Sequence, residues 1–131
     1  HDVMKKIFFS VFFFLFLGSN LNAEWTKSGS VSGNAIYFDQ QTLKIVNNIR
    51  YILIMVDYAK PSDFGDLSSR SYIEINCNNM MRRSLVKDYF KLPLAKGNSS
   101  EGSGSIKDLE WIYNKPTTLI GNLNKRICEI N

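Results

Sequence analysis

Histidine is nearly absent from this chain of 131 residues, and cysteine is scarce. The single histidine is His1, and the two cysteines are Cys77 and Cys128. Serine or cysteine nucleophiles in catalytic triads need an imidazole as general base, and zinc sites draw most of their ligands from histidine and cysteine. These absences argue against both kinds of site, and we expect neither an enzyme nor a cofactor.

Phosphate-binding and carboxylate-based chemistry also lack a fitting pattern. The glycines at positions 29, 33, 97, 102 and 104 do not have the spacing of a phosphate loop or a dinucleotide fingerprint. Asp57, Asp63 and Asp66 are the closest acidic residues, but they flank a loop that contains proline and glycine. Turn formation and solvation explain them better than glycoside hydrolysis or calcium binding does.

Long apolar runs are missing except near the N-terminus. Residues 7–17 form an apolar segment that follows Lys5 and Lys6 and precedes the small, polar residues 18–23. As a helix this segment would span roughly 16 Å, well short of the hydrocarbon core of a bilayer. This order predicts a signal peptide over residues 1–23, with 1–3 as an upstream extension. An uncleaved anchor is the alternative, because Leu21 occupies a position where a small residue is preferred.

Removal of residues 1–23 would leave one exported domain, residues 24–131, without a transmembrane segment. It would carry 14 Lys+Arg and 11 Asp+Glu, a net charge of +3. That excess is too small to indicate a nucleic-acid partner. The residue directly after Ala23 is Glu24 and not a cysteine, so we expect no lipid anchor. We expect the protein in the periplasm or on the outer cell surface.

Cys77 and Cys128 are expected to form a disulfide, because export would bring them to an oxidising compartment. Two free thiols or a metal pair are the alternatives, although the spacing fits no metal motif. In the loop-entropy model the bond would contribute roughly 4 kcal/mol.

Short apolar and β-branched segments separated by turn residues predict a β-rich domain. We expect strands at residues 35–38, 43–46, 50–58, 70–77, 82–92 and 109–113, with turns at 29–34, 39–42 and 47–48. In the fourth of these strands, alternation places Ile73, Ile75 and Cys77 on the buried face.

After Pro116, either Thr117 or Thr118 can cap a short helix. Its apolar face would consist of four residues at helical spacing: Leu119, Ile120, Leu123 and Ile127. The predicted fold is therefore a small α+β domain, an antiparallel sheet with a C-terminal helix and one disulfide.

Basic residues at alternating positions suggest a candidate binding face. Arg83, Lys87 and Lys91 would share one side of the strand at 82–92 and could meet an acidic protein surface or a sulfated glycan. A solvated face, or an edge strand that lysine protects from aggregation, is the simpler interpretation. The aromatic residues Trp25, Phe64, Trp111 and Tyr113 are likewise interpreted as core or loop-packing residues.

An ordered set of features runs through residues 25–128. They are Trp25, Tyr37–Asp39, Val46, Asp57-Tyr58, Ser68–Tyr72, Glu74–Cys77, Arg82-Arg83, Trp111 and Arg126–Cys128. In this order they resemble the bacterial surface-adhesin protein E family. The resemblance implies a sheet-rich α+β fold and exposure outside the inner membrane of a Gram-negative cell.

The resemblance also implies a non-enzymatic protein that adheres to host matrix or serum proteins. The alternative is a small periplasmic inhibitor or accessory protein. Such a protein would act through one rigid loop, either residues 60–66 or residues 97–105.

Overall fold

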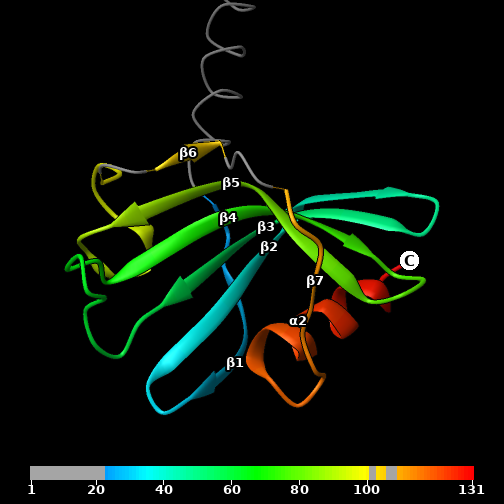
Figure 1. Cartoon of the computed structure of the whole chain (residues 1–131), viewed down its shortest axis with the longest axis horizontal. Coiled ribbons are helices and arrows are strands. Elements are labelled where there is room, and N and C mark those ends of the chain that lie inside the picture. Colours follow the sequence, from blue (N-terminus) through cyan, green and yellow to red (C-terminus); the bar gives the residue numbers. More distant parts are fainter. Residues whose placement is uncertain (1–22, 101–102, 106–108) are drawn as a thin grey trace, which may run out of the picture.

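In the described part of the chain, a curled antiparallel sheet packs against one helix (Figure 1). The computed structural model describes residues 23–100, 103–105 and 109–131, so the predicted signal peptide lies outside the described residues except for Ala23. The strands are β1 (Thr26–Val31), β2 (Asn34–Val46), β3 (Ile49–Asp57), β4 (Ser68–Asn76), β5 (Met81–Phe90), β6 (Gly104–Ser105) and β7 (Ile112–Tyr113). A 3-10 turn, η1 (Pro93–Ala95), follows β5, and the helix is α2 (Leu119–Cys128). The predicted α+β fold is confirmed.

Strands that are neighbours in the sheet are mostly neighbours in the sequence. The order is β1-β2-β3-β4-β5-β6, and β7 also pairs with β5. The tight turn between β1 and β2 holds Ser32 and Gly33 at φ values of 53° and 84°. Glycine adopts this left-handed conformation without steric cost. The turn predicted at residues 29–34 was too long, because Gly29–Val31 belongs to β1.

β2 passes through residues 39–42, which the sequence predicted as a turn. Its pairing with β3 is irregular between Asp39 and Lys44, but the strand continues. The Thr42 hydroxyl donates to the Asp39 carbonyl at 2.7 Å and accepts from the Leu53 amide at 2.9 Å. Because this hydroxyl bridges the interrupted part of the ladder, the two predicted strands form one.

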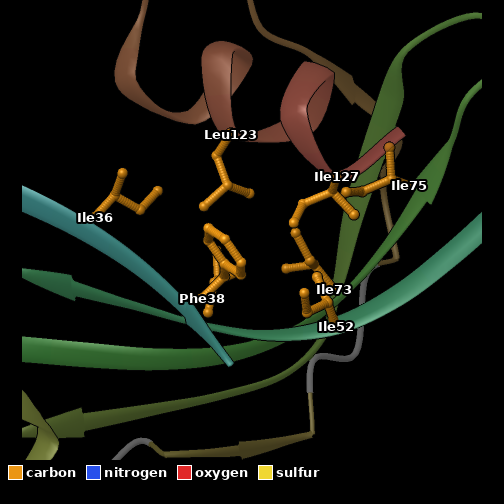
Figure 2. Close-up of a cluster of buried hydrophobic side chains, with 8 residues drawn as sticks. Ile36, Phe38, Ile52, Ile73, Ile75, Leu123 and Ile127 are labelled. Atoms are coloured by element: carbon orange, nitrogen blue, oxygen red, sulfur yellow. The ribbon is translucent and has the colours of Figure 1, made fainter. Parts of the chain in front are cut away.

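The hydrophobic core lies between one face of the sheet and α2, as Figure 2 shows. Its buried members are Ile36, Phe38, Ile52, Ile54, Ile73, Ile75, Leu123 and Ile127. Alternate residues of a strand share one face. The predicted inward orientation of Ile73 and Ile75 is confirmed, since both are completely buried, and Cys77 packs against the same core.

The helix begins where the sequence predicted. The Thr118 hydroxyl accepts a hydrogen bond from the Gly121 amide at 3.1 Å and so caps α2. The predicted apolar face is confirmed, with Leu123 and Ile127 fully buried and the other two members partly buried. The predicted disulfide is also confirmed. It joins Cys128 at the end of α2 to Cys77 just after β4, across a sequence separation of 51.

Two strands are shorter than predicted. The strand predicted at 82–92 is β5 and ends at Phe90, and the strand predicted at 109–113 is reduced to β7, residues 112–113. Pro93 has no amide proton to donate to a ladder, which favours a chain that leaves the sheet at this point. Within the described ranges, no helix has the length and apolar character needed to cross a membrane.

Candidate functional site

Two loops meet at one end of the sheet, the left end in Figure 1. One is the β3–β4 loop, residues 58–67, and the other is the segment after β5, residues 91–100. The Ser100 hydroxyl donates to Oδ1 of Asp66 at 2.9 Å, and Nζ of Lys91 lies 3.1 Å from the same oxygen. Asp66 is only 4% exposed, so one buried carboxylate joins the two loops.

A hollow of about 780 Å³ lies between these loops. We call it the loop pocket, and it is lined by Ser62, Phe64, Asp66, Tyr89, Lys91, Asn98, Ser99 and Ser100. Its volume is typical of ligand sites, which occupy about 300–1,000 Å³. Both segments that the sequence suggested as alternative binding loops contribute to it.

Internal hydrogen bonds order the β3–β4 loop. The Ser62 amide donates to the Asp66 carbonyl at 2.9 Å, and the Gly65 amide donates to the Ser62 carbonyl at 2.8 Å. The Asp66 amide also donates to the Ser62 hydroxyl at 3.1 Å. Gly65 has a φ of 80°, which explains glycine at this position. The resulting turn presents Phe64 at its tip, where the residue is 86% exposed.

The segment after β5 is anchored by Ser68, a completely buried residue at the start of β4. Its hydroxyl donates to the Leu92 carbonyl at 2.6 Å and accepts from the Ala95 amide at 2.9 Å. Further along, the Ser100 amide donates to the Tyr89 carbonyl at 2.7 Å. The segment is therefore attached to the end of the sheet at both ends, and it forms a fixed wall of the loop pocket.

Two titratable groups of the loop pocket have shifted pKa values. Desolvation by burial acts to raise the pKa of Asp66, but the hydrogen bonds from Lys91 and Ser100 and the charge of Lys91 lower it below its ordinary value. Desolvation raises the pKa of Tyr89, and Tyr58 and Asp66 add to this effect. At neutral pH the pocket thus combines a carboxylate–ammonium pair with a neutral phenol, hydroxyl groups, an amide and an aromatic ring. Such a set is suited to binding a ligand.

The predicted basic face is not one face, which is a correction to the sequence analysis. In the β4–β5 ladder Arg83 pairs with Glu74, whereas Leu85 is an extra residue of β5 without a partner. This β-bulge reverses the alternation of side chains. Arg83 therefore projects from the face away from α2, and Lys87 projects from the opposite face. Lys91 lies beyond the strand, in the loop pocket.

The three basic side chains also differ in their surroundings. Arg83 donates to Glu74 at 2.7 Å. Desolvation, followed by the charge of Arg82, lowers the pKa of Lys87. Lys91 pairs with Asp66. Binding of an acidic partner by these residues stays a prediction, but the three side chains cannot contact such a partner from one common face of the sheet.

A polar and aromatic network on the face away from α2 was not predicted. Glu74, 7% exposed, accepts hydrogen bonds from the Tyr51 hydroxyl at 3.1 Å and from Arg83. Tyr51 stacks on Tyr72 with ring centroids 6.3 Å apart, and the Arg83 guanidinium lies 4.4 Å from the Trp111 ring centroid. The hydrogen bond to Glu74, followed by desolvation, raises the pKa of Tyr51. The alternation of residues 70–77 placed Tyr72 and Glu74 together and was the available signal.

The aromatic residues interpreted as packing residues divide into two groups. Trp25 and Trp111 are half-buried, in agreement with that interpretation. Phe64 and Tyr113 are 86% and 55% exposed, so the interpretation is wrong for them. Phe64 lies at the tip of a turn that hydrogen bonds between Ser62, Gly65 and Asp66 hold in place.

A second hollow of about 600 Å³ lies between the β1–β2 turn and the start of α2. Its lining is mainly apolar and includes Val31, Ile36, Val56, Leu119 and Ile120. Its described lining residues include neither an ion pair nor an aromatic ring, so the loop pocket is the stronger candidate.

The family model described as Surface-adhesin protein E matches residues 25–129. No curated protein matches the sequence. Among solved structures, crystal form II of Haemophilus influenzae protein E is similar with a TM-score of 0.57 and 18% identity, covering 77% of this chain and 91% of that one. Protein E from non-typeable Haemophilus influenzae has a TM-score of 0.55 and 17% identity, covering 82% and 85%. At this identity the likeness to the solved structures supports the fold.

Proposed function

This chain belongs to the surface-adhesin protein E family, and from that membership we propose an exported, non-enzymatic binding protein of the cell envelope. We place its contact with host matrix or serum proteins at the loop pocket. One observation carries this placement. Phe64 is 86% exposed at the tip of an ordered loop, directly beside a hollow of ligand size. Exposed aromatic residues in such surroundings are typical anchors of protein interfaces.

The disulfide and the N-terminal sequence support export. Disulfides persist in oxidising compartments such as the periplasm and the cell surface. Both cysteines of the chain take part in the bond, so neither is available for a lipid. We therefore propose cleavage of residues 1–23 and a mature protein, residues 24–131, that is held in the periplasm or on the outer surface without a lipid anchor.

The test measures binding of purified residues 24–131 to surfaces coated with basement-membrane extract and with whole serum. We expect saturable binding to at least one surface, and Phe64→Ala should weaken it about tenfold, as loss of an interface anchor does. Val31→Ala is the matched control, because Val31 is 57% exposed at the second hollow. Absence of binding to both surfaces, or equal effects of the two variants, would contradict the proposal.

Surface display is tested separately with protease added to intact cells. Digestion of the protein while a periplasmic marker survives would support an adhesin. Protection of the protein would instead favour the alternative, a periplasmic inhibitor or accessory protein. The ordered β3–β4 loop suits this alternative as well, because a preformed loop loses little conformational entropy on binding to either kind of partner. A pull-down from periplasmic extract should then return one stoichiometric partner that the Phe64→Ala variant fails to retain.

A further inference from the structure

Phe64 presents an aromatic ring to solvent at a fixed position. Burial of a phenylalanine side chain stabilises a folded protein, and the isolated domain forgoes most of this stabilisation at Phe64, which is 86% exposed. The hydrogen bonds of Ser62 order the loop, and Nζ of Lys91 donates to the Phe64 carbonyl. The ring is thus carried by a backbone that is tied to the wall of the loop pocket.

Neutral polar residues line the hollow beside Phe64. The hydroxyl groups of Ser62, Ser99 and Ser100, the amide of Asn98 and the phenol of Tyr89 line the same hollow. Hydroxyl and amide groups donate and accept hydrogen bonds. These lining residues can therefore both donate hydrogen bonds to a ligand and accept hydrogen bonds from it.

The charges of the described lining are already matched. Lys91 is the ammonium group and Asp66 the carboxylate, and the two lie 3.1 Å apart. An anionic ligand would have to compete with Asp66 for Lys91, and it would leave that carboxylate, 4% exposed, without its cation. The pocket therefore disfavours sulfated or carboxylated ligands.

We propose that the loop pocket binds a neutral saccharide, with a pyranose ring against Phe64 and its hydroxyl groups bonded to the serine and asparagine side chains. The C–H face of such a ring is apolar and slightly positive, which matches the negative face of an aromatic ring. This inference rests on the proposed function and specifies its chemistry, because it makes the glycans of host glycoproteins the recognised element.

The test titrates three neutral disaccharides, lactose, N,N′-diacetylchitobiose and maltose, into the isotope-labelled protein and follows its backbone amide resonances. We expect at least one of them to shift the amides of Ser62, Phe64 and Ser100 saturably, in the millimolar range. The affinity for the disaccharide should be the same at low and high salt, because the ligand carries no charge that salt could screen. Phe64→Trp should bind as the wild type does, whereas Phe64→Leu should bind about tenfold more weakly, equivalent to about 1.4 kcal/mol.

Val31→Ala is again the control, and dispersed spectra establish that each variant is folded. The proposal is overturned if no disaccharide shifts these amides, or if Phe64→Leu binds as tightly as the wild type. It is also overturned if a sulfated heparin disaccharide or N-acetylphenylalaninamide shifts them and the neutral sugars do not. Such results leave the proposed function intact as long as Phe64→Ala still weakens binding to matrix or serum, because the contact would then be with protein.

Discussion

Arg83 and Lys87 lie in the same strand, β5, but project from opposite faces of the sheet. The extra residue Leu85 stands between them, and the ladder resumes beyond it with the alternation reversed. Arg83 consequently joins the buried carboxylate of Glu74, while Lys87 lies near Arg82 on the other face. Two residues of the same charge type thus have different roles.

Replacement of Arg83 and of Lys87 by alanine should have different effects on stability. Arg83→Ala leaves Glu74, 7% exposed, without its cation, and should lower the free energy of unfolding by about 1–3 kcal/mol. Lys87→Ala removes an ammonium group whose pKa is lowered by desolvation and should change stability by less than about 0.5 kcal/mol. Urea denaturation of the two variants measures both values. Similar effects at both positions would contradict the different surroundings of the two side chains.

The disulfide should account for a large part of the stability. Mass spectrometry of the exported protein should find one intramolecular bond between Cys77 and Cys128 and no free thiol. Because the bond closes a long loop, replacing both cysteines with alanine should lower the free energy of unfolding by about 4 kcal/mol. Two cysteines that alkylate in the native protein would refute this prediction.

Acid should loosen the loop pocket. The pKa of Asp66 is lowered in the folded protein, so its carboxylate stabilises the fold above the ordinary value of about 4. That stabilisation is lost as the pH falls from this value through the lowered pKa. A carbon-13 NMR titration of the carboxyl group gives the pKa, and Asp66→Asn should reduce the acid sensitivity. Asp63→Asn, at an exposed position of the same loop, serves as the control. If both variants reduced the acid sensitivity of the fold equally, the loss of stability at low pH could not be assigned to Asp66.

Gly121 should not tolerate a side chain, although it lies within α2. A Cβ atom at this position would stand 1.9 Å from the Lys115 carbonyl oxygen, a backbone atom. Helix propensity alone predicts that alanine would stabilise the helix by about 1 kcal/mol. We expect the reverse, a loss of about 2 kcal/mol or more, because the β7–α2 connection must move. Thermal denaturation checks this against Asn122→Ala, an exposed neighbour that should be neutral or slightly stabilising.

Local patterns in the sequence were sufficient for the elements that build the core. Alternation identified Ile73 and Ile75 as buried, and helical spacing identified the face of α2 that contains Leu123 and Ile127. These patterns are reliable because a sheet or helix with one buried face must repeat apolar residues at its own period. The cysteine count fixed the pairing of the predicted disulfide, because the chain has only Cys77 and Cys128.

Irregularities within the strands could not be read in the same way. The hydroxyl of Thr42 bridges two strands where the sequence suggested a turn, and the bulge at Leu85 divides the predicted basic face. Both depend on how one strand pairs with its neighbour. A period-two pattern contains no signal for a residue that is added on one side of a ladder only.

The sequence by itself determined which faces of β4 and α2 are buried, since the periodic spacing of apolar residues is a property of residues close along the chain. It also determined which cysteines are joined, since the chain has only two. Only the tertiary structure decided where function is expected. Asp66 and Ser100 belong to loops that are separated by two full strands, and only the antiparallel pairing of β4 with β5 returns the chain to the same end of the sheet. The exposure of Phe64 was also visible only in the tertiary structure, where the hydrogen-bonded β3–β4 loop holds this residue outside the core between the sheet and α2.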